Sequence, residues 1–285
     1  MAQSRKLIKA RIKSIRNTRK ITKAMELVAA SKMRRATAAT MRSRPYTREA
    51  WATIRAVLRS APELTHPLLK AKPMATKSLL ILFTSDRGLA GGFNVNIIRA
   101  ALAEARRQGL KNIEVLGVGR RGADALERAG AKVVGRFSAL SNNPNFTDLL
   151  PVARMAFEGF LKGEYRNVTL AYTDFISGIT QKPRLHELLP LTPDMEKNGG
   201  MDYKFEPSPI RVLDRVLPAL VETMTWHALL ESTASEHAAR MMAMKSASDA
   251  AKDMLDTLTF TYNQARQASI TQEIAEISGG KAALE

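Results

Sequence analysis

The sequence predicts an α/β protein with long helices, in which N- and C-terminal helices form an antiparallel coiled coil beside a parallel-sheet middle domain. Both ends of the chain contain long stretches without Gly or Pro, where apolar or small residues recur every three or four positions. Between these stretches, short aliphatic runs alternate with helical patterns. With 285 residues, 45% of them hydrophobic, the chain is long enough to bury a core.

The N-terminal stretch is predicted to form one long helix. No Gly or Pro occurs before Pro45, so about 38 residues, roughly 57 Å of helix, can form without interruption. One face carries Ile8, Ile12, Ile15, Thr18, Thr22, Met25 and Ala29. Pro45 is expected to kink or end this helix, because proline disfavours α geometry at the residue before it. Residues 46–60 should then continue as a second helical segment.

The C-terminal stretch mirrors this pattern after Pro218. Its expected seam alternates steps of four and three, as in a heptad repeat: Ala251, Leu255, Leu258, Tyr262, Ala265, Ser269 and Gln272. Small residues keep the seam thin on both helices, which lets them approach closely and favours an intramolecular antiparallel coiled coil. Gly279 and Gly280 either cap this helix or leave a frayed tip.

The middle of the chain alternates strand and helix patterns. Strands are expected at residues 79–84, 113–118, 131–134 and 168–173, and helices at residues 95–108, 123–129 and 149–161. This repetition predicts a Rossmann-like parallel sheet with right-handed crossovers. Two more extended segments, 181–189 and 203–205, flank a loop at 190–200. The expected domains are residues 1–60, 75–207 and 208–285.

Charge is concentrated at the N-terminus. The net charge is +17, and residues 1–60 hold 17 Lys/Arg against only Glu26 and Glu49. This asymmetry predicts an acidic partner, which could be nucleic acid, anionic lipid or a carboxylate-rich protein. The chain has no cysteine, which excludes disulfides and thiolate chemistry. No uncharged stretch is long enough to span a membrane and no signal peptide is evident, so we expect neither a membrane span nor export.

Two glycine-rich turns are candidates for phosphate binding. Residues 85–94 follow the first expected strand, and residues 117–122 follow the second. Neither has the spacing of a dinucleotide fingerprint after a first strand, and no P-loop lysine follows, so tight structural turns are the favoured interpretation. The four histidines, at 66, 186, 227 and 237, are scattered without metal-ligand spacing. We therefore assign no catalytic, cofactor-binding or metal-binding residue.

Two other classes of function remain open on these residues alone. One is a basic coiled coil that binds nucleic acid, although residues 1–45 contain no aromatic side chain for base stacking. The other, less favoured, is a dinucleotide-binding enzyme. A basic rod that faces carboxylates on an encircling protein accounts better for a charged helix without aromatic residues.

Four segments resemble the gamma subunit family of bacterial-type F1Fo ATP synthases. The two longest are similar to the family's terminal signatures: RNTRKITKAMELVAASKMRR at residues 16–35 and ARQASITQEI at residues 265–274. The turn SDRGLAGGFN at 85–94 and the segment RMMAMK at 240–245 resemble internal parts of the family. The four matches occur in the expected order over nearly the whole chain.

The resemblance implies a central rotor shaft with no catalytic residues of its own. It would couple proton flow through Fo to conformational cycling of a hexamer of three alpha and three beta subunits. Its other partners would be the epsilon subunit and the c-ring. ATP and magnesium would be bound by the surrounding subunits, so no cofactor and no nucleic acid are expected here. Membrane association would come only through Fo, at the cytoplasmic face of the cell membrane.

The resemblance also assigns contacts to individual residues. Lys23 and Met25 match positions near an acidic segment of a beta subunit, and Arg266 and Gln267 match positions facing a carboxylate-bearing beta loop. The rigid fork of an arginine suits a carboxylate. Tyr203 and Glu206 match foot positions facing the c-ring and epsilon, although the two residues between them depart from the family pattern.

Overall fold

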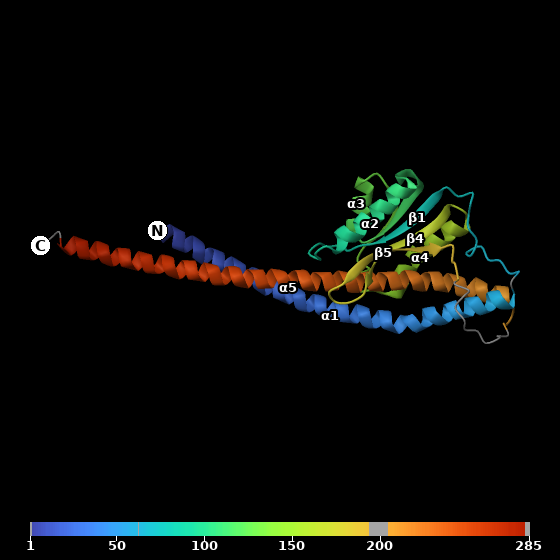
Figure 1. Ribbon diagram of the computed structural model, residues 1–285, viewed down its shortest axis with the longest axis horizontal. Coiled ribbons are helices and arrows are strands. Elements are labelled where there is room, and N and C mark those ends of the chain that lie inside the picture. The colour runs from blue at the N-terminus through green and yellow to red at the C-terminus, as the bar shows by residue number, and fades with distance from the viewer. Residues whose placement is uncertain (1, 62, 194–204, 283–285) are drawn as a thin grey trace. The chain divides into compact units, whose positions relative to one another are not determined.

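The computed structural model describes residues 2–61, 63–193 and 205–282 (Figure 1). Its helices are α1 (Ala2–Ser60), α2 (Phe93–Gln108), a 3-10 turn η1 (Leu110–Asn112), α3 (Arg120–Arg128), α4 (Phe146–Leu161) and α5 (Pro209–Ala282). Its strands are β1 (Lys77–Phe83), β2 (Ile113–Val118), β3 (Lys132–Phe137), β4 (Tyr165–Phe175) and β5 (Gln181–Leu189). Contacts divide the chain into a two-helix unit (residues 1–29 and 241–285) and an α/β unit (residues 30–240).

Both terminal helices are longer than the sequence pattern alone indicates. α1 continues through Pro45 to Ser60, so the proline does not end the helix. An internal proline lacks one N–H donor, and this loss is tolerated where tertiary packing supports the following turns. Such packing is present here, because Ile54 and Val57 are fully buried. α5 likewise continues through Gly279 and Gly280, so the helix is not capped at that point.

The α/β unit contains one sheet with strand order β3-β2-β1-β4-β5. The first four strands pair in parallel, as expected, whereas β5 runs antiparallel to β4. Only residues 176–180 connect β4 to β5, and a parallel pairing would need a crossover of a dozen or more residues. Ser177 closes the turn by donating its backbone N–H to the Thr180 carbonyl, 3.0 Å away. The sheet is therefore mixed, with a hairpin at one edge.

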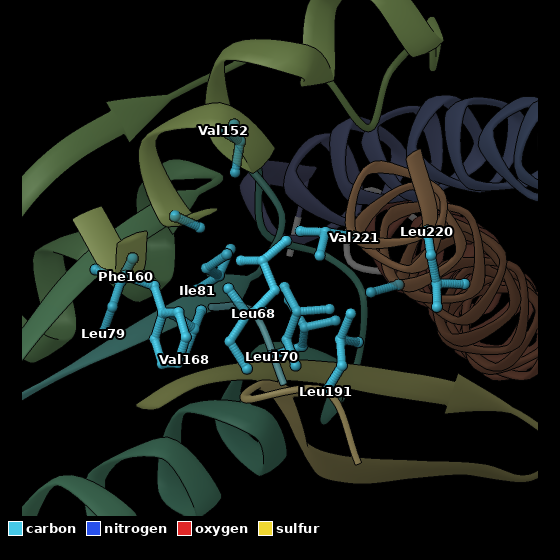
Figure 2. Close-up of a cluster of buried hydrophobic side chains, with 14 of the residues drawn as sticks. Leu68, Leu79, Ile81, Val152, Phe160, Val168, Leu170, Leu191, Leu220 and Val221 are labelled. Atoms are coloured by element: carbon cyan, nitrogen blue, oxygen red, sulfur yellow. The ribbon is translucent and has the colours of Figure 1, made fainter. Parts of the chain in front are cut away.

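Side chains alternate between the two faces of the sheet. On one face, Leu80, Leu82 and Val115 pack with Ile97 of α2 and Leu126 of α3. On the other, Leu79, Ile81 and Leu170 pack with Val152 and Phe160 of α4, as Figure 2 shows. The two apolar faces follow from the period of two along each strand, and both are covered because parallel sheets are normally buried on both sides.

The second of these cores also includes the long helices. Ile54 and Val57 of α1 and Leu213, Leu217, Leu220 and Val221 of α5 belong to the same buried cluster as the sheet residues. Leu68 and Leu170 belong to this cluster too, and Figure 2 labels them together with Leu220 and Val221 of α5. Within the α/β unit the helices and the sheet therefore share one hydrophobic core.

The two-helix unit follows the expected seam. On α1, Thr22 and Ala29 are buried and Thr18 is exposed. The stripe's other members, Ile8, Ile12, Ile15 and Met25, are partly buried. On α5, Ala251, Leu255 and Ser269 are buried, Leu258, Tyr262 and Ala265 are partly buried, and Gln272 is exposed. The heptad pattern is thus confirmed up to Ser269. None of the helices in the described part of the chain combines the length and the apolarity needed to cross a bilayer.

Candidate partner-contact surfaces

The outward faces of the two-helix unit are unusually apolar. A pair of helices buries only one stripe of each, so apolar residues elsewhere remain exposed to solvent. The exposed ones here are Leu7, Ile21, Leu27, Val28, Met242, Met254, Phe260, Ile270, Ile274 and Ile277. So many large apolar side chains along one pair of helices are typical of a surface that another protein covers.

The positive charge of this unit lies on α1. Residues 1–29 contain nine Lys/Arg and a single acid, Glu26, whereas residues 241–285 contain four Lys/Arg and six Asp/Glu. A cationic surface of this kind attracts acidic partners and raises their rate of association. An acidic partner is therefore expected to approach the α1 side of the unit.

Lys23 and Met25 occupy different positions on α1. The Lys23 ammonium lies 3.0 Å from the Glu26 carboxylate, one turn away, and the Lys23 side chain is 57% exposed. Met25 is partly buried and lies on the seam stripe with Thr22. The lysine is therefore the more accessible of the two, and its pairing with Glu26 leaves room for a competing carboxylate, because exposed pairs are weak.

Arg266 and Gln267 are both exposed on α5, next to the partly buried seam residue Ala265. Arg266 is the sole cation in the sequence between Lys252 and Lys281. Within the described part of the chain it forms no ion pair, so its fork of donors is available to a partner. The expected foot pair cannot be compared, because Tyr203 lies outside the described residues, while Glu206 is exposed just before α5.

The glycine-rich turns are filled by the chain's own groups. The Asp86 carboxylate accepts hydrogen bonds from the backbone N–H of Arg120, at 3.1 Å, and of Ala139, at 2.7 Å. It thereby occupies the N-terminus of α3, where a phosphate would bind in a nucleotide site. A Cβ on Gly119 would come within 2.0 Å of the Thr84 carbonyl oxygen, so this glycine serves close packing. These contacts support the structural interpretation of both turns.

The histidines are dispersed over the α/β unit. His66 Nε2 lies 3.5 Å from the Asp214 carboxylate, and burial lowers the pKa of this histidine. Burial also lowers the pKa of His186. The described residues contain no group of three or more His, Cys, Asp or Glu side chains placed to hold a metal ion.

Comparison with known proteins decides the family. A family model described as ATP synthase matches residues 4–284. The ATP synthase gamma chain of Herpetosiphon aurantiacus is 43% identical over 100% of this chain and 99% of its own length. That of Symbiobacterium thermophilum is 40% identical, with both chains covered completely.

The chain belongs to the ATP synthase gamma chain family. As a gamma chain it is the central-stalk subunit of a rotary F1Fo ATP synthase, and it is not itself a catalytic subunit. The resemblance found in the terminal signatures is thus confirmed over the full length.

Solved structures agree with this gamma-chain assignment. A chain of the Tetrahymena thermophila mitochondrial ATP synthase, in a structure of its central stalk and c-ring, matches 80% of this chain with 27% identity and a TM-score of 0.60. A chain of the Euglena gracilis mitochondrial ATP synthase matches all of this chain with a TM-score of 0.69. At 16% identity, the second match supports the fold alone.

Sequence reasoning missed one cluster in this gamma chain. Arg240 lies 2.8 Å from the Glu236 carboxylate one turn earlier on α5, and both side chains are nearly buried. Arg240 also approaches the Gly88 carbonyl in the turn after β1, at 3.5 Å. The i, i+4 spacing of Glu and Arg was a usable signal for the pair. Its burial against the turn depends on tertiary packing and has no local signature.

Proposed function

We propose that this gamma chain transmits torque through side-chain contacts with beta subunits at one end and with epsilon and the c-ring at the other. In this proposal, Lys23 and Met25 lie against an acidic segment of a beta subunit, while Arg266 and Gln267 contact a carboxylate-bearing beta loop. Tyr203 and Glu206 form the foot. The observation that carries the proposal is Arg266, an exposed cation that forms no ion pair with the described residues and lies on an otherwise acidic stretch of helix.

The physics of such coupling is a shift of populations. The two helices of the two-helix unit present different charges and different apolar residues, so an asymmetric shaft makes unequal contacts with the subunits around it. Each orientation therefore favours one conformation of each surrounding site over the others. Rotation changes nucleotide affinity by this differential contact energy, without any contact between the shaft and the nucleotide.

The location follows from the same assignment. The chain would lie at the cytoplasmic face of the cell membrane and would be held there through Fo. The absence of a candidate span among the described helices is consistent with this location. The two-helix unit would be enclosed by the alpha and beta subunits, which would cover its exposed apolar residues and offer carboxylates to α1.

Replacing Arg266 tests the proposed beta contact. Arg266→Ala should leave the carboxylate of the beta loop without its partner and weaken the contact by about 2–5 kcal/mol. Arg266→Lys should restore part of this energy, because a point charge does not reproduce the guanidinium fork. ATP hydrolysis and proton-driven synthesis in reconstituted complexes should both fall in the alanine variant, while nucleotide binding to the beta subunits of the same complexes should survive.

Lys252→Ala provides the matched control for this experiment. Lys252 is exposed and lies 14 residues before Arg266, two heptads away on the same face of α5. Lys252→Ala changes the net charge by the same amount as Arg266→Ala but leaves the proposed contact of Arg266 in place. Full coupled activity of the Arg266→Ala complex would show that Arg266 does not form the proposed contact. An equal loss of activity in the Lys252→Ala complex would show the same.

A further inference from the structure

A cavity of about 370 Å³ lies within the α/β unit between α1, α5 and the loop before α4. Lys32 and Arg35 line it from α1, Asn142 from the loop, and Trp226, Thr233 and His237 from α5. Its volume falls at the lower end of the range of about 300–1,000 Å³ that small-molecule sites occupy. None of the nucleotide-like turns described above contributes to it.

The cavity carries excess positive charge. Lys32 and Arg35 lie one turn apart on α1 and make no ion pair within the described residues, although Lys32 donates a hydrogen bond to the side chain of Asn142. Burial and the nearby charge of Arg240 lower the pKa of Lys32, while Glu236 opposes this effect. Glu236 itself is paired with Arg240 at 2.8 Å, so it does not neutralise the two lining cations.

Two buried polar atoms at the cavity have no partner among the described residues. They are the hydroxyl of Thr233, a residue 2% exposed, and Nε2 of His237, a residue 5% exposed. A buried hydroxyl or ring nitrogen without a hydrogen bond lowers the stability of the fold by about 1–3 kcal/mol, unless a water molecule or a ligand supplies the missing hydrogen bond. Both atoms therefore indicate a polar occupant.

The tautomer of His237 can be derived from its neighbour. Arg240 Nη1 lies 3.1 Å from His237 Nδ1, and a guanidinium can only donate, so Nδ1 accepts and Nε2 carries the hydrogen. Burial and the charges of Arg240 and Lys32 lower the pKa of this histidine to about 4, against a smaller opposing effect of the Ser141 backbone, whose contact with the ring does not meet hydrogen-bond geometry at Nε2. The ring is thus a neutral donor at pH 7.

We propose that this cavity binds a phosphate group, either inorganic phosphate or the phosphate of a nucleotide. The lining offers an ammonium, a guanidinium fork, an N–H and a hydroxyl, and these donors match the several acceptor oxygens of a phosphate. The volume exceeds what a single phosphate fills, and the indole of Trp226 lies on the wall, where a base or another flat group could pack. The bound anion would join α1, α5 and the loop, and so stiffen the α/β unit.

Binding can be followed through Trp226. The chain has two tryptophans, and Trp51 lines a separate cavity, so a Trp51→Phe background leaves Trp226 as the sole reporter. The full-length chain is titrated with inorganic phosphate, ADP and adenosine, and binding is confirmed by calorimetry. Saturable binding of phosphate and ADP, with none of adenosine, is the expected result. Much tighter binding of ADP than of phosphate would identify the nucleotide as the source of the phosphate.

Matched variants distinguish phosphate binding in this cavity from nonspecific attraction of phosphate to the positive charge of the chain. Arg35→Gln should weaken phosphate binding about tenfold, and the isosteric Thr233→Val about threefold, because each removes one donor. Arg34→Gln removes the same charge from the neighbouring residue, which is exposed like Arg35 but does not line the cavity, and should change the affinity by less than about twofold. Circular dichroism verifies that each variant is folded. The proposal is overturned if no probe saturates up to about 10 mM, or if Arg34→Gln weakens binding as much as Arg35→Gln.

Discussion

At the scale of single residues, buried polar groups hold the elements of the α/β unit in register. The Glu114 side chain on β2 is only 8% exposed. It accepts hydrogen bonds from Lys77 Nζ at 3.0 Å, Lys132 Nζ at 2.9 Å and the Tyr165 hydroxyl at 2.9 Å. Burial raises the pKa of Glu114, but these hydrogen bonds outweigh burial and leave it below its usual value. One carboxylate on β2 thereby connects β1, β3 and β4.

Replacing Glu114 should destabilise the α/β unit. Glu114→Gln should lower the free energy of unfolding by about 1–2 kcal/mol at pH 7, a modest loss because both lysines are largely exposed. A carboxyl with a depressed pKa stabilises the fold above its unfolded pKa of about 4.3, and this contribution disappears as pH falls through the folded pKa. The difference between wild type and variant should therefore narrow in acid.

Urea unfolding followed by tryptophan fluorescence measures this effect, since Trp51 and Trp226 both belong to the α/β unit. Glu127→Gln is the control, because Glu127 pairs with Arg136 while 60% exposed and should cost less than about 0.5 kcal/mol. If Glu114→Gln matches this control, or if its effect grows as the pH is lowered, Glu114 does not hold the sheet as described.

Single-residue roles were also the least accessible to sequence reasoning. Lys23 and Arg266 were selected through a family resemblance, and the structure adds only their exposure. The role of Asp86 as the group that fills the N-terminus of α3 was not predicted. It depends on a loop 34 residues away from Arg120, and no local pattern shows such a contact.

At the scale of elements, hydrophobic periodicity predicted most of the fold. The expected strands at 113–118 and 181–189 agree with β2 and β5, and all three middle helices were found with earlier starts. The errors came where tertiary structure overrides local preference. Packing carries α1 through Pro45, and the short connection after β4 reverses the direction of β5. The four strands expected in the parallel sheet do pair in parallel, and the segment 181–189, predicted only as extended, adds an antiparallel edge strand.

We can test the close packing of the thin seam in the two-helix unit by enlarging one of its small residues on α1. Ala29 on the predicted seam is 2% exposed, whereas Ala24 is exposed on the same helix. Ala29→Leu should overfill the seam and destabilise the unit by about 1–3 kcal/mol. Ala24→Leu makes the same change in solvent and should be nearly neutral, because Leu is almost as good a helix former as Ala.

Amide hydrogen exchange of the full-length chain measures this difference locally. Ala29→Leu should speed exchange in residues 2–29 and 241–278 and leave the β1 amides of the α/β unit unchanged. Equal protection in the two variants would show that Ala29 does not lie in a close-packed seam.

At the scale of the whole molecule, function depends on two differently built units. In the α/β unit the long helices share a core with the sheet, so these helices cannot turn without the sheet. The two-helix unit buries a narrow seam and leaves charge and apolar side chains on its outer faces. This division suits a shaft that is driven through the first unit and contacts its surroundings through the second.

Rotation of the chain relative to the alpha and beta subunits is the most direct test of this account. The sequence has no cysteine, so Arg99→Cys on the exposed side of α2 supplies a single attachment point for a bead. The complex is immobilised through its beta subunits, with no other reactive thiol present. On addition of ATP, we expect the bead to rotate in one direction. The bead on the Arg266→Ala complex should rotate at a lower rate. Continued ATP hydrolysis with a bead that never turns would contradict the central claim that this chain is the rotor.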